Sequence, residues 1–246
     1  MQLNVLAPLW VGEIYKQLPC YSEIASHARI LKTVDYLLSY DADVYVLCEV
    51  QIETLELLAE HFGSEYSVTF TSNKEGFWCE YLEGKQWVKN GTCVVTKNSS
   101  VHVIKRWSLD LRDGCMATTL EALVGSIPIT IVSIHFDTGD RKYNERKVLL
   151  NYLRTVKGPC IVSGDFNMIS THKFANMGFY QSMGLEGHNT TVLLEGIIDH
   201  TLVRGVRYIR STILDVPHSN YDLVSRACMN PSHSDHYATI SVVGLM

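Results

Sequence analysis

The sequence predicts an α/β protein in which helices cover the outside of two packed sheets. Its first third alternates strand-like and helix-like segments, and its middle is a series of β-rich segments separated by Gly, Asn or charged residues. Of its 246 residues, 46% are hydrophobic and 19% are charged, which supplies enough apolar material for a sizeable core. We find no repeat, linker or break in composition, so residues 1–246 are expected to form one domain.

The first third predicts the order strand, helix, strand, helix. Pro8 ends the first strand, and Ser22 followed by Glu23 is typical of a helix start. The second strand is a buried Val-Tyr-Val-Leu run, and Gly63 ends the second helix. The expected elements are a strand at Gln2–Ala7, a helix at Ser22–Leu38, a strand at Asp43–Cys48 and a helix at Glu53–Phe62.

The middle and last parts predict antiparallel strands joined by short turns. Asp140 is placed to begin a helix that Gly158 and Pro159 end, and a short buried strand follows. A helical stretch is expected next, near His172 to Met183. The other expected strands are Tyr66–Thr71, Phe77–Tyr81, Thr92–Thr96, Val101–Trp107, Met116–Ala122, Ile129–His135, Ile197–Val203, Val206–Leu214 and Tyr237–Val243.

Charge and cysteine content narrow the possible classes of protein. The formal net charge is −5 and no run of Lys and Arg is long, which argues against a broad basic face for long duplexes. The 7 cysteines are scattered without C-x-x-C spacing, so free thiols in a reducing compartment, cytoplasmic or nuclear, are expected. No signal peptide, membrane span or obligate protein partner is predicted.

One short segment, residues 161–167, organises the rest of the chain. An apolar run ends at Gly164, and Asp165 and Asn167 follow with Phe166 between them. Residues two apart on an extended backbone face the same way, so both polar side chains can converge while the aromatic ring packs beneath. The ends of buried strands are common ligand sites in α/β enzymes. The structural alternative is an Asx-turn that caps the next segment.

Other polar residues also interrupt or end apolar strands. Each alone has a structural explanation, such as a sheet-edge hydrogen bond or a structural ion pair. Together they are harder to explain that way, because a buried charge without a partner is costly. The set comprises Asn4, Glu49, His135, Asp165, Asn167, Asp199, and the triplet Ser234-Asp235-His236.

The residue types in this set suit one chemistry. Glu49, Asn4 and Asp165 offer a few hard oxygen ligands, as Mg²⁺ prefers, and no Cys/His cluster with zinc spacing occurs. His135 and His236 can bond phosphate oxygens or move protons. Asp199 can orient His236 as a carboxylate orients any catalytic imidazole. A cation, a carboxylate and imidazoles around a tetrahedral phosphorus are the groups expected in an enzyme that hydrolyses a phosphate ester.

The order of these motifs resembles the endonuclease/exonuclease/phosphatase superfamily, over residues 4 to about 243. Two stretches, N-V-L-A from Asn4 and D-A-D-V-Y-V-L-C-E-V around Glu49, are most similar to the deadenylase and nocturnin-like branch of this superfamily. Cys48 stands where the family usually has Gln. The resemblance implies a four-layered α/β sandwich of two packed, mainly antiparallel sheets flanked by helices. The motifs are Asn4, V-L-C-E-V, S-I-H-F, S-G-D-F-N, I-I-D-H and S-D-H-Y-A.

The resemblance also implies roles for individual residues. Glu49 would be the principal Mg²⁺ ligand, with Mn²⁺ as a possible substitute, and Asn4 and Asp235 would border the metal. Arg112, just before a strand, matches a position where family members often bind phosphate. The catalytic set would be Asp165 orienting or deprotonating water, Asn167 holding the water or phosphate, His135 contacting the scissile phosphate, and His236 paired with Asp199.

Three functions remain open at this point. The first is a Mg²⁺-dependent phosphodiesterase that acts on single-stranded nucleic acid or a nucleotide. The second is a phosphatase or phospholipase C-like hydrolase for an inositol phosphate, sphingomyelin or another non-nucleic phosphate ester. The third is a non-enzymatic binding module. The basic pairs Arg141-Lys142 and Arg146-Lys147 can contact phosphate, although solvated surface is the usual role of such pairs.

Overall fold

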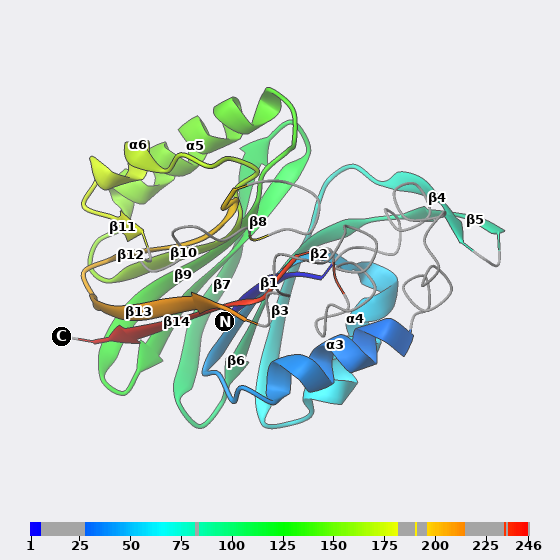
Figure 1. Cartoon of the computed structure of the whole chain (residues 1–246), viewed down its shortest axis with the longest axis horizontal. Helices are drawn as coiled ribbons and strands as arrows, with labels where there is room; N and C mark the ends of the chain where they lie inside the picture. Colours follow the sequence, from blue (N-terminus) through cyan, green and yellow to red (C-terminus); the bar gives the residue numbers. More distant parts are fainter. Residues whose placement is uncertain are drawn as a thin grey trace, which may run out of the picture.

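The centre of the molecule is a pair of six-stranded sheets (Figure 1). The computed structural model describes residues 1–5, 28–81, 84–181, 190, 196–214, 234 and 236–245. The first sheet has the strand order β13 (Arg207–Ile213), β14 (Thr239–Gly244), β1 (Gln2–Asn4), β2 (Val44–Gln51), β6 (Asn90–Lys97) and β3 (Tyr66–Ser72).

The second sheet packs against the first. Its order is β11 (Tyr180–Gln181), β12 (Asp199–Arg204), β10 (Cys160–Asp165), β9 (Ile127–His135), β8 (Cys115–Val124) and β7 (Val101–Arg112). One pair of neighbours in each sheet is parallel, β1 with β2 and β9 with β10, and the other pairs are antiparallel. The prediction of two packed, mainly antiparallel sheets is therefore confirmed.

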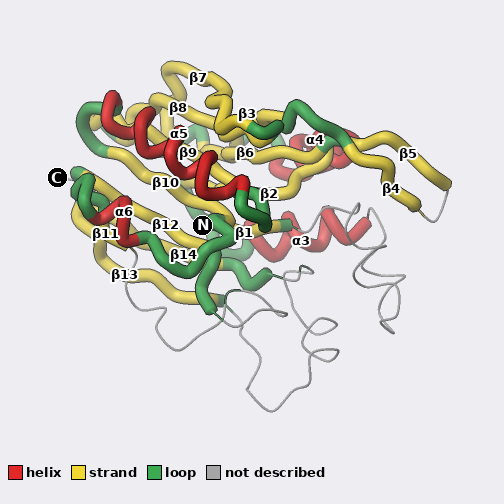
Figure 2. Tube along the Cα trace, turned by 90° about the horizontal axis from the view of Figure 1, so that it is seen from above, coloured by secondary structure: helices red, strands yellow, loops and turns green. Residues whose placement is uncertain are grey.

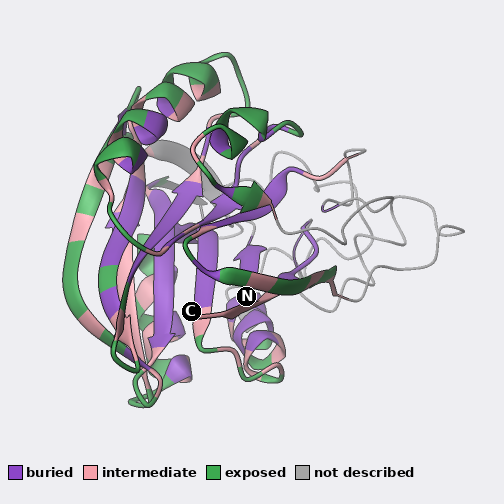
Figure 3. Ribbon diagram, turned by 90° about the vertical axis from the view of Figure 1, so that its left-hand side faces the viewer, coloured by how far each residue is buried: buried purple, intermediate pink, exposed green. Residues whose placement is uncertain are grey.

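Helices cover the two outer faces. Helices α3 (Ala28–Leu38) and α4 (Ile52–Phe62) lie outside the first sheet, and α5 (Arg141–Thr155) and α6 (His172–Ala175) outside the second (Figures 1 and 2). The buried side chains form three apolar clusters: one between each helical layer and its sheet, and one between the sheets. Figure 3 shows the buried strands between outward-facing, exposed helix surfaces. These layers are the four-layered sandwich expected from the resemblance.

A separate hairpin, β4 (Phe77–Tyr81) with β5 (Gly84–Val88), extends from one end of the sandwich (Figure 2). β5 was absent from the predicted elements. The predicted helix near 172–183 was too long: α6 ends at Ala175, and Tyr180 and Gln181 form a strand. That segment adds an edge to the second sheet, because Tyr180 pairs with Val203.

Close approach of β9 and β10 explains the glycine in the central motif. A Cβ on Gly164 would lie 1.9 Å from the carbonyl oxygen of Ile134, and the glycine has φ +143°. Only glycine allows both the approach and this backbone conformation. The same register places Asp165 directly opposite His135.

Four of the 7 cysteines, Cys48, Cys93, Cys115 and Cys160, are free thiols in the described part of the chain. In the part of the chain that the structure describes, no helix is both long and apolar enough to cross a membrane.

Candidate active site

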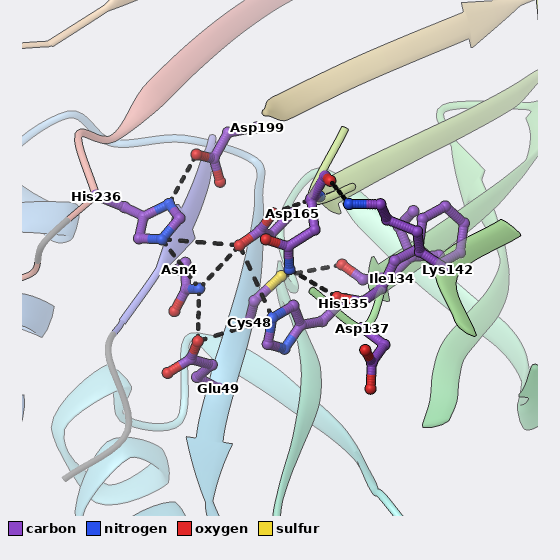
Figure 4. Close-up of polar contacts among 12 residues, drawn as sticks. Asn4, Cys48, Glu49, Ile134, His135, Asp137, Lys142, Asp165, Asp199 and His236 are labelled. Carbon is purple, nitrogen blue, oxygen red and sulfur yellow. Dashed lines mark hydrogen bonds and ion pairs between the residues drawn. The ribbon is translucent and has the colours of Figure 1, made fainter. Parts of the chain in front are cut away.

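Polar side chains from both sheets meet at one end of the sandwich (Figure 4). β1 and β2 contribute Asn4 and Glu49, and His236 lies just before β14 in the same sheet. The second sheet contributes His135 at the end of β9, Asp165 at the end of β10 and Asp199 at the start of β12. Residues predicted from separate parts of the sequence thus lie together, because the strands that carry them end at one edge of the sandwich.

Asn4 is the centre of this cluster. Its side-chain nitrogen lies 2.9 Å from Glu49 Oε1 and 3.2 Å from Asp165 Oδ2. The same nitrogen lies 3.4 Å from His236 Nε2. Because the amide contacts both carboxylates, one from each sheet, it ties the two halves of the site together.

The two histidines lie on either side of Asp165. His135 Nε2 is 3.7 Å from Glu49 Oε1 and 3.8 Å from Asp165 Oδ2. His236 Nε2 is 3.7 Å from the same Asp165 oxygen. These separations exceed a hydrogen bond and bring both imidazoles close enough to act on one group bound between them.

Asp199 orients His236 from the opposite sheet. His236 Nδ1 lies 2.7 Å from Asp199 Oδ2, which fits an Nδ1–H that donates to the carboxylate and leaves Nε2 facing the site. The second carboxylate oxygen, Oδ1, accepts a 2.7 Å hydrogen bond from the side-chain amide of Gln2. The side-chain oxygen of Gln2 in turn accepts a hydrogen bond from the Thr239 hydroxyl. Asp199 is fully buried, so both of its oxygens are held in place. The predicted pairing of Asp199 with His236 is present.

A bulge in β2 aims Glu49 at the site. Tyr45, Leu47 and Val50 all face the helices α3 and α4, so two residues, Cys48 and Glu49, occupy the space of one. The pairing of β2 with β6 shifts there, and Glu49 has φ +60°, a conformation that costs about 1–2 kcal/mol for a residue with a Cβ. With regular alternation the Glu49 carboxylate would point into the helix layer.

Cys48, the departure from the family pattern, lies beneath the cluster. Its thiol donates a 3.0 Å hydrogen bond to the carbonyl of Ile134, which joins β2 to β9. Burial raises the pKa of the Cys48 thiol, so the group stays protonated and acts as a neutral donor.

The surroundings of Asp165 change the acidity of its carboxyl group. Burial, with Asp199 nearby, raises the pKa of Asp165 to about 6. Its Oδ1 accepts a 2.8 Å hydrogen bond from the backbone N–H of Asn167, which is the Asx-turn considered as the structural alternative. The Asx-turn and the cluster are therefore compatible, because Oδ1 accepts the hydrogen bond of the turn and Oδ2 contacts Asn4 in the cluster.

Asn167 turns away from regular strand geometry. Its φ is +47°, which asparagine tolerates better than most residues, and its side-chain nitrogen donates to the carbonyl of Phe136 at 2.7 Å. Phe166 is buried in the core, as predicted.

The donor set fits a divalent cation. Glu49, Asp165 and Asp199 bring three carboxyl groups into a buried volume. Among the described residues, neither Asp165 nor Asp199 forms an ion pair with a Lys or Arg. Burial, and then the neighbouring Asp199, raises the pKa of Asp165, and buried like charges of this kind favour a bound cation or a proton.

Two overlapping groups can hold the ion. Ligand atoms of Asp165, Asp199 and His236 lie within 4.8 Å of one another. The second group is Glu49, Asp165 and Asn4, in which the Asn4 amide contacts both carboxylates. Asp235, which was also predicted to border the metal, lies outside the described residues.

Arg112 is at the same end of the second sheet but not in the cluster. It is the last residue of β7, with φ +77° and an exposed side chain, and its backbone N–H donates to the Asp110 carboxylate at 2.9 Å. Two strand spacings, roughly 10 Å, separate its strand from β9. No recorded contact of the described residues joins Arg112 to the carboxylates, so its role stays a prediction.

Sequence patterns missed two residues that support the site. Gln2 was not singled out, although alternation on β1 places it on the same face as Asn4. Ser234 was named only as part of its triplet; its hydroxyl donates to the Asn4 carbonyl at 2.5 Å and accepts the His236 N–H at 3.1 Å.

The sandwich and its cluster of carboxylates and imidazoles define a class of proteins, the α/β-sandwich phosphoester hydrolases. The chain belongs to the Endonuclease/Exonuclease/phosphatase family, whose model matches residues 1–236. Members of this family hydrolyse phosphoesters and are typically dependent on divalent metal ions. No curated protein sequence matches the chain.

Solved structures share the fold at low sequence identity. The human nocturnin catalytic domain with bound sulfate is 18% identical, with a TM-score of 0.61 over 98% of this chain and 92% of that one. D. rerio TDP2 with a single-strand DNA product is 13% identical, with a TM-score of 0.66 over 88% and 91%. A mannosyl-6-phosphatase of Bacteroides thetaiotaomicron is 15% identical, with a TM-score of 0.66 over 88% and 90%.

Proposed function

We propose that residues 1–246 form one catalytic domain, a Mg²⁺-dependent phosphodiesterase that cleaves single-stranded nucleic acid or a nucleotide. The observation that carries this proposal is the contact of one amide, that of Asn4, with Glu49, Asp165 and His236. Carboxylates and imidazoles at this spacing suit metal-assisted attack of water on phosphorus.

Glu49 would be the principal ligand of Mg²⁺, with Asn4 and Asp235 bordering the ion. The residue types support a hard cation, because Glu49, Asp165 and Asn4 bring carboxylate and amide oxygens together. A Mg²⁺ ion held by these residues would supply Lewis-acid stabilisation of the charge that develops on the phosphate oxygens. Mn²⁺ accepts the same ligands and is expected to substitute.

Asp165 is the group best placed to take a proton from the attacking water. Burial and the neighbouring Asp199 raise the pKa of Asp165, which makes its carboxylate a stronger base than an ordinary aspartate. The water oxygen then bonds to phosphorus as the ester P–O bond breaks, and the leaving-group oxygen takes a proton from solvent to depart as an alcohol. His135 and His236 each present Nε2 beside Asp165. His135 can donate to a phosphate oxygen, whereas His236, with its proton on Nδ1, accepts a proton at Nε2 and can donate there only once it is doubly protonated. Asn167 would hold the water or the phosphate.

Two neighbours of the same fold are consistent with a phosphodiester substrate. TDP2 was solved with a single-strand DNA product, and nocturnin with sulfate, an anion of phosphate-like shape. A phosphatase or phospholipase C-like hydrolase of a non-nucleic phosphate ester is the alternative, and the mannosyl-6-phosphatase neighbour favours it.

A substrate panel tests the proposal. Single-stranded RNA and DNA oligonucleotides, mononucleotides, inositol phosphates and sphingomyelin are each incubated with Mg²⁺ or with EDTA. We expect oligonucleotides or nucleotides to be hydrolysed only with Mg²⁺, and Asp165→Asn to abolish hydrolysis. Cleavage of the inositol phosphate or lipid alone would establish the alternative, and hydrolysis of none would favour a binding module.

A further inference from the structure

Three side chains at the start of α5 form a compact group that the proposed reaction does not use. We call Lys142, Tyr143 and Arg146 the α5 cation cluster. The Lys142 ammonium lies 5.9 Å from the centroid of the Tyr143 ring, and the Arg146 guanidinium carbon lies 5.3 Å from it. Both distances are within the range of cation–π attraction, so the ring holds two cations near each other.

The cluster is attached to the loop that carries Asn167. Lys142 Nζ donates to the carbonyl of Asn167 at 2.9 Å and to that of Thr138 at 3.0 Å. Arg146 reaches the next residue, with its Nη1 3.7 Å from Met168 Sδ. Figure 4 shows Lys142 beside the carboxylate and histidine cluster. A group bound to these cations therefore lies directly next to the site.

Neither cation is neutralised. Both side chains are half-buried, and in the described part of the chain no carboxylate pairs with Lys142 or Arg146. Lysine has three N–H donors and arginine five, so donors remain after the recorded contacts. Most surface cations are simply solvated. Two half-buried cations without an acid partner, held together by an aromatic ring, instead form a suitable anion site.

We propose that the α5 cation cluster binds the phosphate adjacent to the scissile phosphate of a nucleic-acid strand. This inference rests on the proposed function and narrows it, because only a substrate with a second phosphate uses the cluster. The enzyme then prefers oligonucleotides, or nucleotides with an added terminal phosphate, to esters that carry the scissile phosphate alone. Tyr143 orients the cations, and Lys142 and Arg146 contact the anion.

Short substrates isolate the second phosphate. A dinucleoside monophosphate contains only the scissile group, and its 5′- and 3′-phosphorylated forms each add one phosphate on a known side. We expect kcat/KM to be about tenfold higher for one of the two phosphorylated forms, since a charge-assisted hydrogen bond has that effect. The form that gains shows on which side of the scissile bond the cluster binds.

Variants test whether the cluster causes this preference. Arg146→Ala and Tyr143→Leu should each remove most of the gain in kcat/KM, and Arg146→Lys should retain part of it. The matched control is Arg154→Ala, which removes a cation from the last turn of the same helix and should keep the gain. Melting temperatures of all variants verify that they are folded.

Salt dependence gives a second measurement. For a longer single-stranded oligonucleotide, the slope of log(kcat/KM) against log salt should fall by about 0.7 for each lost phosphate contact. An unchanged slope and an unchanged phosphate preference in Arg146→Ala would overturn the cluster proposal while leaving the phosphodiesterase proposal intact. Absence of hydrolysis of every nucleic-acid substrate by the wild type would instead overturn the proposed function itself.

Discussion

His236 Nδ1 and Asp199 Oδ2 lie 2.7 Å apart across the interface between the two sheets. The imidazole precedes β14 in the first sheet and the carboxylate begins β12 in the second. The orientation of a candidate catalytic histidine therefore depends on how the sheets pack, and it is sensitive to changes on either side of that interface.

Asp199→Asn tests the role of this pair. The amide retains the shape of the side chain but removes the charge that holds the Nδ1–H tautomer, so we expect kcat to fall about 10- to 100-fold with the fold intact. Steady-state kinetics and circular dichroism measure both effects. Asp35→Asn, at an exposed position of α3, is the control. Full activity of Asp199→Asn would contradict the pairing.

Gln2→Leu tests whether Gln2 helps to orient His236 indirectly, by holding Asp199 in place. The substitution deletes the hydrogen bond to Asp199 Oδ1 and the acceptor for Thr239. We expect kcat to fall about tenfold and the free energy of unfolding to fall by about 1–3 kcal/mol. Gln2→Glu should be more damaging, because it places a second carboxylate against Asp199. Equal rates for Gln2→Glu and the wild type would show that Gln2 does not act through Asp199.

Glu49→Gln tests the metal site without an activity assay. Mg²⁺ at about a hundredfold excess over its Kd should stabilise the wild type by about 2.7 kcal/mol, and the melting temperature should rise accordingly. The variant should lose most of this rise because it lacks the principal charged ligand. Glu56→Gln, on the exposed face of α4, should retain it. A Mg²⁺ response that survives Glu49→Gln would move the site to Asp165, Asp199 and His236.

His200 should make stability depend on pH. It is fully buried, with Nδ1 2.8 Å from Gln181 and Nε2 2.8 Å from the Met168 carbonyl, and burial lowers the pKa of this imidazole. The unfolded chain, with a histidine pKa of about 6.5, then binds the proton more readily. This stability is present above pH of about 6.5 and is lost as the pH falls toward the folded-state pKa.

Comparison with His200→Gln isolates that contribution. The free energy of unfolding of the wild type should fall relative to that of the variant between pH 7 and pH 5, as measured by urea unfolding in EDTA. Parallel pH profiles for the two proteins would show that His200 titrates alike in the folded and unfolded states.

Gly164→Ala and Gly125→Ala form a matched pair. Both glycines have positive φ, but a Cβ at Gly125 meets nothing within 4 Å, whereas one at Gly164 meets the Ile134 carbonyl at 1.9 Å. We expect Gly125→Ala to cost about 1 kcal/mol of unfolding free energy from backbone strain alone. Gly164→Ala should cost about 3 kcal/mol or more, because β9 and β10 must separate. Equal losses of unfolding free energy in the two variants would show that the close approach of β9 and β10 is not the reason for glycine at position 164.

Local patterns in the sequence predicted most of the layered fold. The Val-Tyr-Val-Leu run of β2, the stripe of α3 and the turn residues between the middle strands each determine their own element. The α6 segment is an exception: its residues suit a helix, yet Tyr180 pairs with β12 because the sheet has an open edge there. Tertiary pairing overrides local propensity at such positions.

The candidate site likewise has features that the sequence predicts and features that depend on the tertiary structure. Sequence alone determined which residue types stand at strand ends, and hence that carboxylates, imidazoles and an amide are available for phosphate chemistry. Only the tertiary structure decided that Glu49 points at Asn4, because a bulge with φ +60° reverses the direction that alternation along β2 assigns to it. It also decided that Gln2 supports Asp199, that Lys142 contacts Asn167 and that Arg146 contacts Met168. Each of these contacts joins residues far apart in the sequence, so no local pattern predicts it.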